Sequence, residues 1–144
     1  MLKMVKAPLV ELEWSPELER AALDHLGDIG PRGTLSHSGS DKSTYRDRIE
    51  RYCRWGGSIF EAIDYGARDA ARDVVIAWLV DDGVPKRQHR NNLLGPDQRH
   101  IALAYGRHSV ASFCTIALFA AQVVPLDFVP QLMPGMIDEE ALKK

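Results

Sequence analysis

Residues 110–124, VASFCTIALFAAQVV, constrain the fold of this chain more than any other segment. Small or apolar side chains occupy both alternating sets of positions, whereas a strand with one face in water would alternate with polar residues. The run therefore predicts a strand buried on both faces. A second strand is predicted over residues 100–105, joined to it by a hairpin across residues 106–109. Because both faces of the sheet must be covered, we expect helices above and below it.

The first of these helices begins at Ser15, which can cap it, followed by Pro16 at the first helical position. Apolar residues recur at helical spacing from there to residue 29, and the glycines and proline of residues 30–33 predict its end. His25 lies on the apolar stripe, so we interpret it as a packed core or boundary residue and not as a ligand.

The middle of the chain predicts two more helices and one extended segment. Residues 43–47 open a short helix that is expected to stop at the glycines of residues 56–57. Residues 58–66 are rich in isoleucine, phenylalanine and tyrosine, which favours an extended segment. Residues 69–82 return to the helical period, and Gly83 is expected to provide the left-handed cap.

The length of 144 residues predicts a single domain, assigned to residues 1–124, with residues 125–144 as a C-terminal arm containing three prolines. The net charge of −2 gives no positive field that would attract nucleic acid, and the one basic cluster, residues 86–90, is short. We therefore predict no nucleic-acid partner. No apolar segment is long enough to span a membrane.

Cys53 and Cys114, the two cysteines of the chain, allow one disulfide or none. Cys53 lies in a polar, aromatic stretch, whereas Cys114 lies within the apolar run. Buried thiols usually behave as small hydrophobic groups. We therefore predict two free thiols.

The chain contains no HExxH, GxSxG, P-loop, GxGxxG or paired CxxC motif, which excludes many familiar enzyme classes. The remaining candidates for chemistry are imidazoles and carboxylates that lie far apart in the sequence. His37 occupies a polar loop, and Glu61 is an unusual charge among apolar neighbours. Asp81 and Asp82 lie at a helix C-terminus, where the dipole disfavours negative charge. His100 and His108 are interpreted as ordinary surface or hairpin residues.

Four stretches of the chain, in this order, are similar to landmarks of the CAP superfamily of cysteine-rich secretory proteins, antigen 5 and pathogenesis-related proteins. They are WSPELERAA from Trp14, LSHS around His37, FEAIDYG around Glu61, and WLVDDGVPKRQHRNNLL from Trp78. Each stretch alone is a weak signal, but the ordered series is fairly specific and covers residues 9–124.

The resemblance implies an α+β fold, an α-β-α sandwich with a small antiparallel sheet between helical layers. It also implies a cleft lined by two histidines and two acidic residues, which carry over to His37, Glu61, Asp81 and His89, with Asp82 as the alternative to Asp81. The family's Gly-Glu-Asn is Phe-Glu-Ala here, and its Gly-His is Gln-His. The helix that normally precedes the Trp-Ser-Pro-Glu segment is expected to be missing.

Two imidazoles can bind zinc or another divalent cation, and the carboxylates can complete the shell or orient the rings. The resemblance therefore implies that His37 and His89 are metal ligands, and that a nearby groove takes a lipid, sterol or peptide. We predict a non-catalytic binding module. The alternatives are a hydrolase in which the metal or a His/Glu pair activates water, and a tetrad that only stabilises the fold.

The family resemblance implies an extracellular or cell-envelope location. Residues 1–10 lack the continuous apolar core of a signal peptide. A cytoplasmic location therefore stays open.

Overall fold

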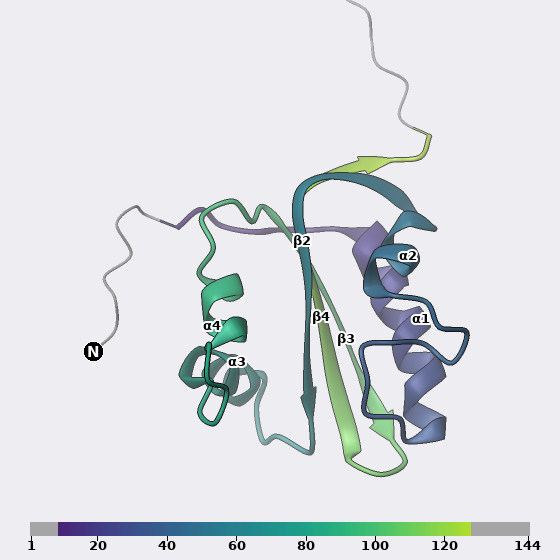
Figure 1. Cartoon of the computed structure of the whole chain (residues 1–144), viewed down its shortest axis with the longest axis vertical. Helices are drawn as coiled ribbons and strands as arrows, with labels where there is room; N and C mark the ends of the chain where they lie inside the picture. The colour runs from purple at the N-terminus through teal and green to yellow at the C-terminus, as the bar shows by residue number, and fades with distance from the viewer. Residues whose placement is uncertain (1–8, 128–144) are drawn as a thin grey trace, which may run out of the picture.

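The computed structural model describes residues 9–127. The elements in chain order are β1 (Glu13–Trp14), α1 (Pro16–Arg32), α2 (Tyr45–Glu50), β2 (Cys53–Tyr65), α3 (Ala71–Val80), α4 (Gln88–Leu93), β3 (His100–His108) and β4 (Ser112–Pro125). The four strands form one sheet in the order β1-β3-β4-β2, with β4 antiparallel to both of its neighbours. Helices α1 and α2 cover one face and α3 and α4 the other (Figure 1). The predicted α+β fold is confirmed.

Strand β4 is the buried centre of the sheet, as the apolar run predicts. Every residue from Cys114 to Ala120 is buried. Its side chains divide between two apolar clusters: Ile116 and Leu118 pack toward α1, whereas Ala117 and Phe119 pack toward Trp78 of α3. A strand with two covered faces therefore explains the continuous apolar run.

The hairpin between β3 and β4 turns later than predicted. Strand β3 continues through residues 106–108, and His108 pairs with Ser112. The His108 side chain is buried, and its Nε2 donates to the Thr34 carbonyl at 3.0 Å. Its Nδ1 accepts from the backbone amides of Val110 and Ala111. His108 is therefore a hairpin residue, as expected, but it is buried and not at the surface, and it holds the turn from inside.

Helix α1 begins where the sequence predicts. The Ser15 hydroxyl oxygen accepts from the Leu18 amide at 3.2 Å, and Gly33, with φ 68°, forms the left-handed cap. The helix passes through Gly30 and Pro31 before it ends. A Cβ atom on Gly30 would lie 2.6 Å from the Arg107 carbonyl oxygen, so this glycine permits the close approach of α1 to β3.

Helix α2 ends earlier, and strand β2 begins earlier, than predicted. The helix stops at Glu50, and Cys53 already pairs with Pro125 of β4. Gly56 and Gly57 lie inside the strand, where the register shifts between Gly56 and Ile59. Gly57 has φ +71°, a conformation that glycine adopts readily and that suits a β-bulge. The two glycines therefore mark a bulge and not a helix end.

The structure adds two short elements that the sequence did not predict, β1 and α4. Residues 128–144 of the predicted C-terminal arm lie outside the described residues. The predicted absence of a first family helix concerns the residues before Trp14, of which 1–8 are likewise outside. Among the described residues, no helix has the length and apolar character needed to cross a membrane.

Candidate functional site

Glu61 and His37 form a hydrogen-bonded pair although they lie far apart in sequence. His37 Nδ1 is 2.8 Å from Glu61 Oε1. The Glu61 side chain is fully buried, whereas 55% of the His37 side chain is exposed. Because a carboxylate accepts hydrogen bonds, Nδ1 carries the proton and Nε2 of the neutral ring keeps its lone pair. The pair thus presents a potential nitrogen ligand to solvent.

The second oxygen of Glu61 binds a buried arginine. Arg48 Nη2 donates to Glu61 Oε2 at 3.0 Å, and the two side chains are 2% and 0% exposed. A buried carboxylate needs such a partner, because an unpaired charge in the protein interior is costly. Arg48, which the sequence analysis did not single out, is therefore part of this site.

The loop that carries His37 is held from two sides. Arg48 Nη2 donates to the His37 carbonyl at 2.9 Å, and His25 Nε2 donates to the Ser36 carbonyl at 2.8 Å. His25 is fully buried, which confirms the interpretation of a packed residue. Burial lowers the pKa of the His25 imidazole below its ordinary value, because the charged form loses its water. Two buried groups therefore fix the backbone on which His37 is mounted.

Asp81 and His89 form a second pair with a similar arrangement. His89 Nδ1 is 2.9 Å from Asp81 Oδ1, and the side chains of His89 and Asp81 are 28% and 3% exposed. Asp81 Oδ2 accepts from the His89 and Arg90 amides at the start of α4. Burial acts to raise the pKa of the Asp81 carboxyl, but the hydrogen bonds from His89 and Arg90 outweigh it, so its pKa lies below the ordinary value.

This second pair also explains the acidic end of α3. Asp81 adopts the left-handed conformation, φ 49°, and replaces Gly83 as the predicted cap of α3. In return, Arg90 of α4 donates to the carbonyls of Leu79 and Val80 at the end of α3. The carboxylate is thus placed by the amides of the next helix. Asp82 forms no part of this arrangement and is exposed.

The four predicted residues come together as two pairs. Along β2, Ile59 and Ile63 pack with the α1 side, and Phe60 and Ala62 with the α3 side. Glu61 alternates with Phe60 and Ala62, so it faces the α1 side, where it binds Arg48 of α2. The His37–Glu61 pair therefore lies on the α1 side of β2, an outer strand of the sheet. The Asp81–His89 pair joins the end of α3 to α4, and these helices cover the opposite face (Figure 1). Within residues 9–127, no three His, Cys, Asp or Glu side chains form a group that could hold a metal.

Each pair nevertheless fits the requirements of a metal-binding histidine. Histidine ligands typically donate one ring N–H to a carboxylate, which fixes the tautomer and leaves the other nitrogen for the metal. His37 and His89 both use Nδ1 in this way, and in the described part of the chain neither Nε2 has a hydrogen bond. Each pair thus offers one imidazole nitrogen, and no third protein ligand accompanies it among residues 9–127.

A groove on the α3 side of the sheet is largely apolar. It has a volume of about 390 Å³, and its lining includes Val74, Val75, Trp78, Leu103 and Tyr105. Its charged lining residues are Arg68 and Asp69. Leu103 is 37% exposed and Tyr105 56% exposed, and both line the groove together with residues of α3. An apolar molecule could therefore contact both the helix and the strand.

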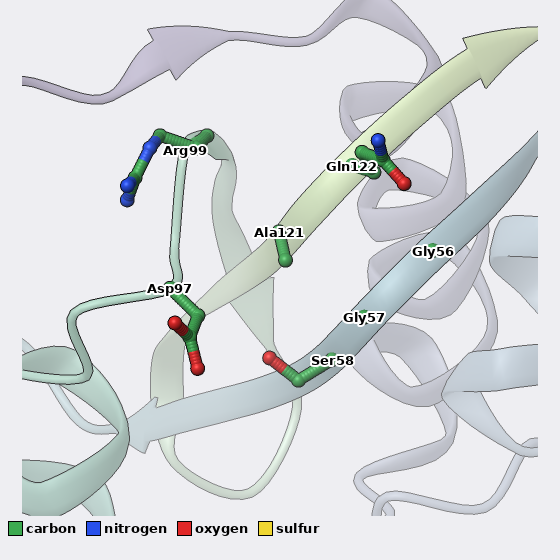
Figure 2. A pocket seen from close by; sticks show the side chains of 7 residues that line it. All are labelled: Gly56, Gly57, Ser58, Asp97, Arg99, Ala121 and Gln122. Carbon is green, nitrogen blue, oxygen red and sulfur yellow. The ribbon is translucent and has the colours of Figure 1, made fainter.

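A second hollow of about 410 Å³ lies beside the bulge in β2; it is open, and its lining mixes polar and apolar groups. Figure 2 shows Asp97 directed toward Ser58, whereas the guanidinium of Arg99 points away. Arg99 Nη1 instead donates to the carbonyls of Pro96 and Gln98. The charged groups at this hollow do not converge on one point, so it provides fewer contacts for a ligand than the groove does.

Cys53 and Cys114 are free and buried, which confirms the prediction of two free thiols. Burial raises the pKa of the Cys53 thiol to about 11 and also raises that of Cys114. Both thiols therefore stay protonated at neutral pH and behave as apolar core groups.

Comparison with known proteins gives a family match and two similar structures. The model of the CAP family, described as cysteine-rich secretory protein family, matches residues 6–122. An outer surface protein from Borrelia burgdorferi has a TM-score of 0.65 at 24% identity, covering 78% of each chain. An extracellular protein containing a SCP domain from Bacillus anthracis str. Ames has a TM-score of 0.58 at 21% identity, covering 78% of this chain and 34% of the other. No curated protein matches significantly.

Proposed function

Since the chain belongs to the CAP family of cysteine-rich secretory proteins, we propose that it is a non-catalytic binding module whose two His–carboxylate pairs hold a divalent cation. The single observation that carries the proposal is the matched geometry of the pairs. In each, a buried carboxylate holds Nδ1 of a more exposed imidazole and leaves Nε2 available. Zinc suits such nitrogen ligands.

The proposed cation would be bound by Nε2 of His37 and of His89, with water completing the shell. When bound, it would supply a positive charge that can attract an anionic group of a ligand. Glu61 and Asp81 would orient the rings from behind. Catalytic zinc sites usually have three protein ligands, whereas these pairs supply two imidazoles. We therefore rank binding above the alternative, hydrolysis by activated water.

The test is a calorimetric zinc titration of the metal-free protein beside His37→Ala and His89→Ala. We expect one zinc per chain in the wild type and loss of binding in each variant, because both rings are needed. His100→Ala, which alters a histidine outside the pairs, is the matched control and should bind as the wild type does. Binding that survives in both pair variants would contradict the proposal.

Melting temperatures of the same proteins separate binding from a purely structural role. Zinc should raise the melting temperature of the wild type and of His100→Ala, since a ligand that binds only the native state stabilises it. If zinc has no effect on any protein while both pair variants melt lower, the pairs serve only to stabilise the fold. Release of product from an ester or peptide substrate by the zinc-loaded wild type would favour the hydrolase.

We also propose that the apolar groove between α3 and β3 takes a lipid, sterol or apolar peptide. The exposed side chains of Leu103 and Tyr105 support this, because apolar surface left in water favours an apolar partner. Titration with a fluorescent fatty acid and a fluorescent sterol tests it. Leu103→Asp should abolish binding, whereas Val110→Asp, at an apolar residue that is 70% exposed and does not line the groove, should not. Equal binding by the two variants would show that the groove is not the binding site.

An extracellular or cell-envelope location is likewise proposed. The family is described as secretory, and the two similar structures belong to an outer surface protein and an extracellular protein. Fractionation of the source cells with an antibody to this chain tests the location. Recovery of the chain only from the cytosol would contradict it.

A further inference from the structure

We propose that Arg48 is a positioning residue that sets which nitrogen of His37 carries the proton, acting through the two oxygens of Glu61. The inference rests on the proposed function, because the nitrogen left unprotonated is the one proposed to bind the cation. Arg48 lies on α2 and is almost completely buried, so it acts on the His37 ring only through Glu61.

The geometry divides Glu61 between two partners. Oε2 accepts from Arg48 Nη2 at 3.0 Å, and Oε1 faces His37 Nδ1 at 2.8 Å. With the guanidinium supplying the opposite charge, the buried carboxyl group stays a carboxylate, and a carboxylate can only accept. His37 must then donate from Nδ1, so Nε2 is the unprotonated nitrogen.

Arg48 is itself held so that it cannot turn away from Glu61. Nη1 donates to the Ser43 carbonyl at 2.9 Å, and Nη2 also donates to the His37 carbonyl at 2.9 Å. The side chain is 2% exposed. The same guanidinium therefore fixes the His37 backbone and the charge of the group that orients its ring. A planar guanidinium suits this task because its donors lie in a fixed geometry.

Removal of the positive charge should reverse the proton arrangement. In Arg48→Met, the buried carboxyl group has no opposite charge. It then either keeps a proton and donates it to Nδ1, or forms an ion pair with a doubly protonated ring. Nε2 carries a proton in both cases and is lost as a ligand. A lysine at position 48 supplies the charge again.

The experiment is a long-range ¹H–¹⁵N spectrum of the histidine rings, recorded without metal at pH ~8, above the ordinary imidazole range. The wild type and Arg48→Lys should show His37 protonated at Nδ1 only, and Arg48→Met should show Nε2 protonated. His108 is an internal reference, because backbone groups alone determine its tautomer. Its signals should not change in any folded variant. An Arg48→Met protein with native His108 signals and an unprotonated His37 Nε2 would overturn the proposal.

Glu61→Gln keeps the inference testable if Arg48→Met does not fold. Arg48 should attract the amide oxygen and turn the NH₂ group toward His37 Nδ1, which then accepts and leaves the proton on Nε2. If Arg48 does not direct the group, the amide oxygen faces Nδ1 and the wild-type tautomer persists, which would also overturn the proposal. A hydrogen-bond coupling between the new amide N–H and Nδ1 identifies the expected arrangement.

Zinc titration of the same variants separates this inference from the proposed function. Loss of an outer partner of a metal-binding histidine typically weakens metal binding by about 10–100-fold, and we expect that for Glu61→Gln. If the tautomer changes as expected but the wild type binds no zinc, the proposed function fails and the role of Arg48 stands. If the wild type binds zinc and the tautomer does not change, the role of Arg48 fails alone.

Discussion

The two faces of the sheet differ in how completely they are closed. On the α1 side, the core includes fully buried apolar residues such as Leu18 and Ile49, together with the buried Arg48–Glu61 ion pair. On the α3 side, the cluster is smaller and Leu103 and Tyr105 remain exposed beside the groove. The closed face can hold a charged pair in a fixed geometry, whereas the open face has room for an apolar ligand.

The largest expected effect is on the ion pair of the closed face. Arg48→Met should lower the free energy of unfolding by ~3–5 kcal/mol, because it breaks a buried ion pair and forces Glu61 to take up a proton or to pair with a protonated His37 ring. Urea denaturation followed by circular dichroism measures the change. The double variant Arg48→Met/Glu61→Gln should recover part of the loss, since a neutral amide needs neither proton uptake nor an opposite charge. A loss below ~1 kcal/mol in the single variant, no more than a surface pair contributes, would show that the two faces do not differ in this way.

The second prediction compares apolar truncations on the two faces. Leu18→Ala should cost ~2–5 kcal/mol, because the leucine is fully buried and leaves a cavity. Leu103→Ala, at the open groove, should cost ~1 kcal/mol or less, as is usual for a partly exposed side chain. The same denaturation experiment measures both. Equal losses would mean that the groove is as tightly packed as the core.

The pH dependence of stability should reveal the buried histidine of the closed face. The pKa of His25 in the folded protein lies below its ordinary value of 6.5 because of burial. As the pH falls through 6.5, the unfolded chain therefore binds more protons than the folded one, and the free energy of unfolding decreases. Nearby Glu61 favours the charged ring and Arg48 opposes it. The melting temperature should therefore fall between neutral and mildly acidic pH, and this fall should be smaller in His25→Gln. An equal fall in the variant would show that His25 is not its cause.

The smallest effects concern the helix starts of the two faces. On the closed face, the Thr44 hydroxyl accepts from the Asp47 amide at 3.2 Å, whereas Ala70, at the start of α3, has no side-chain cap. Thr44→Ala should lose ~1 kcal/mol, and Ala70→Ser should gain up to about 1 kcal/mol. Melting curves of the two variants beside the wild type test these predictions. If both variants became less stable, or both more stable, the proposed difference in capping would be wrong.

The sequence predicted the features that depend on local pattern. The apolar run of residues 110–124 indicated a doubly covered strand, and Ser15 and the segment 30–33 indicated the ends of α1. Gly56 and Gly57 misled the prediction of α2, because a glycine that ends a helix and one that forms a bulge look alike without the partner strand. Asp81 as a cap of α3 was missed for a related reason, since its position depends on the amides of α4.

The candidate site was predictable only in part. The family resemblance predicted His37, Glu61, Asp81 and His89 as site residues, and the structure brings them into two pairs, while their role stays a prediction. That both pairs bind one cation across the edge of β2 is the proposal that the zinc titration tests. Arg48 gave no signal in the sequence, because an arginine among other charged residues of a short helix is normally exposed. Its burial follows from the tertiary position of Glu61.

The order of the strands has a consequence for the folding pathway. Strands β3 and β4 are adjacent in sequence and can pair as a hairpin, whereas β2 reaches β4 only after the intervening α3 and α4 have been looped out. Closing a long loop costs entropy before its contacts form. We therefore expect Glu61 to be docked late, so that stopped-flow refolding should show the hairpin forming before the His37–Glu61 contact.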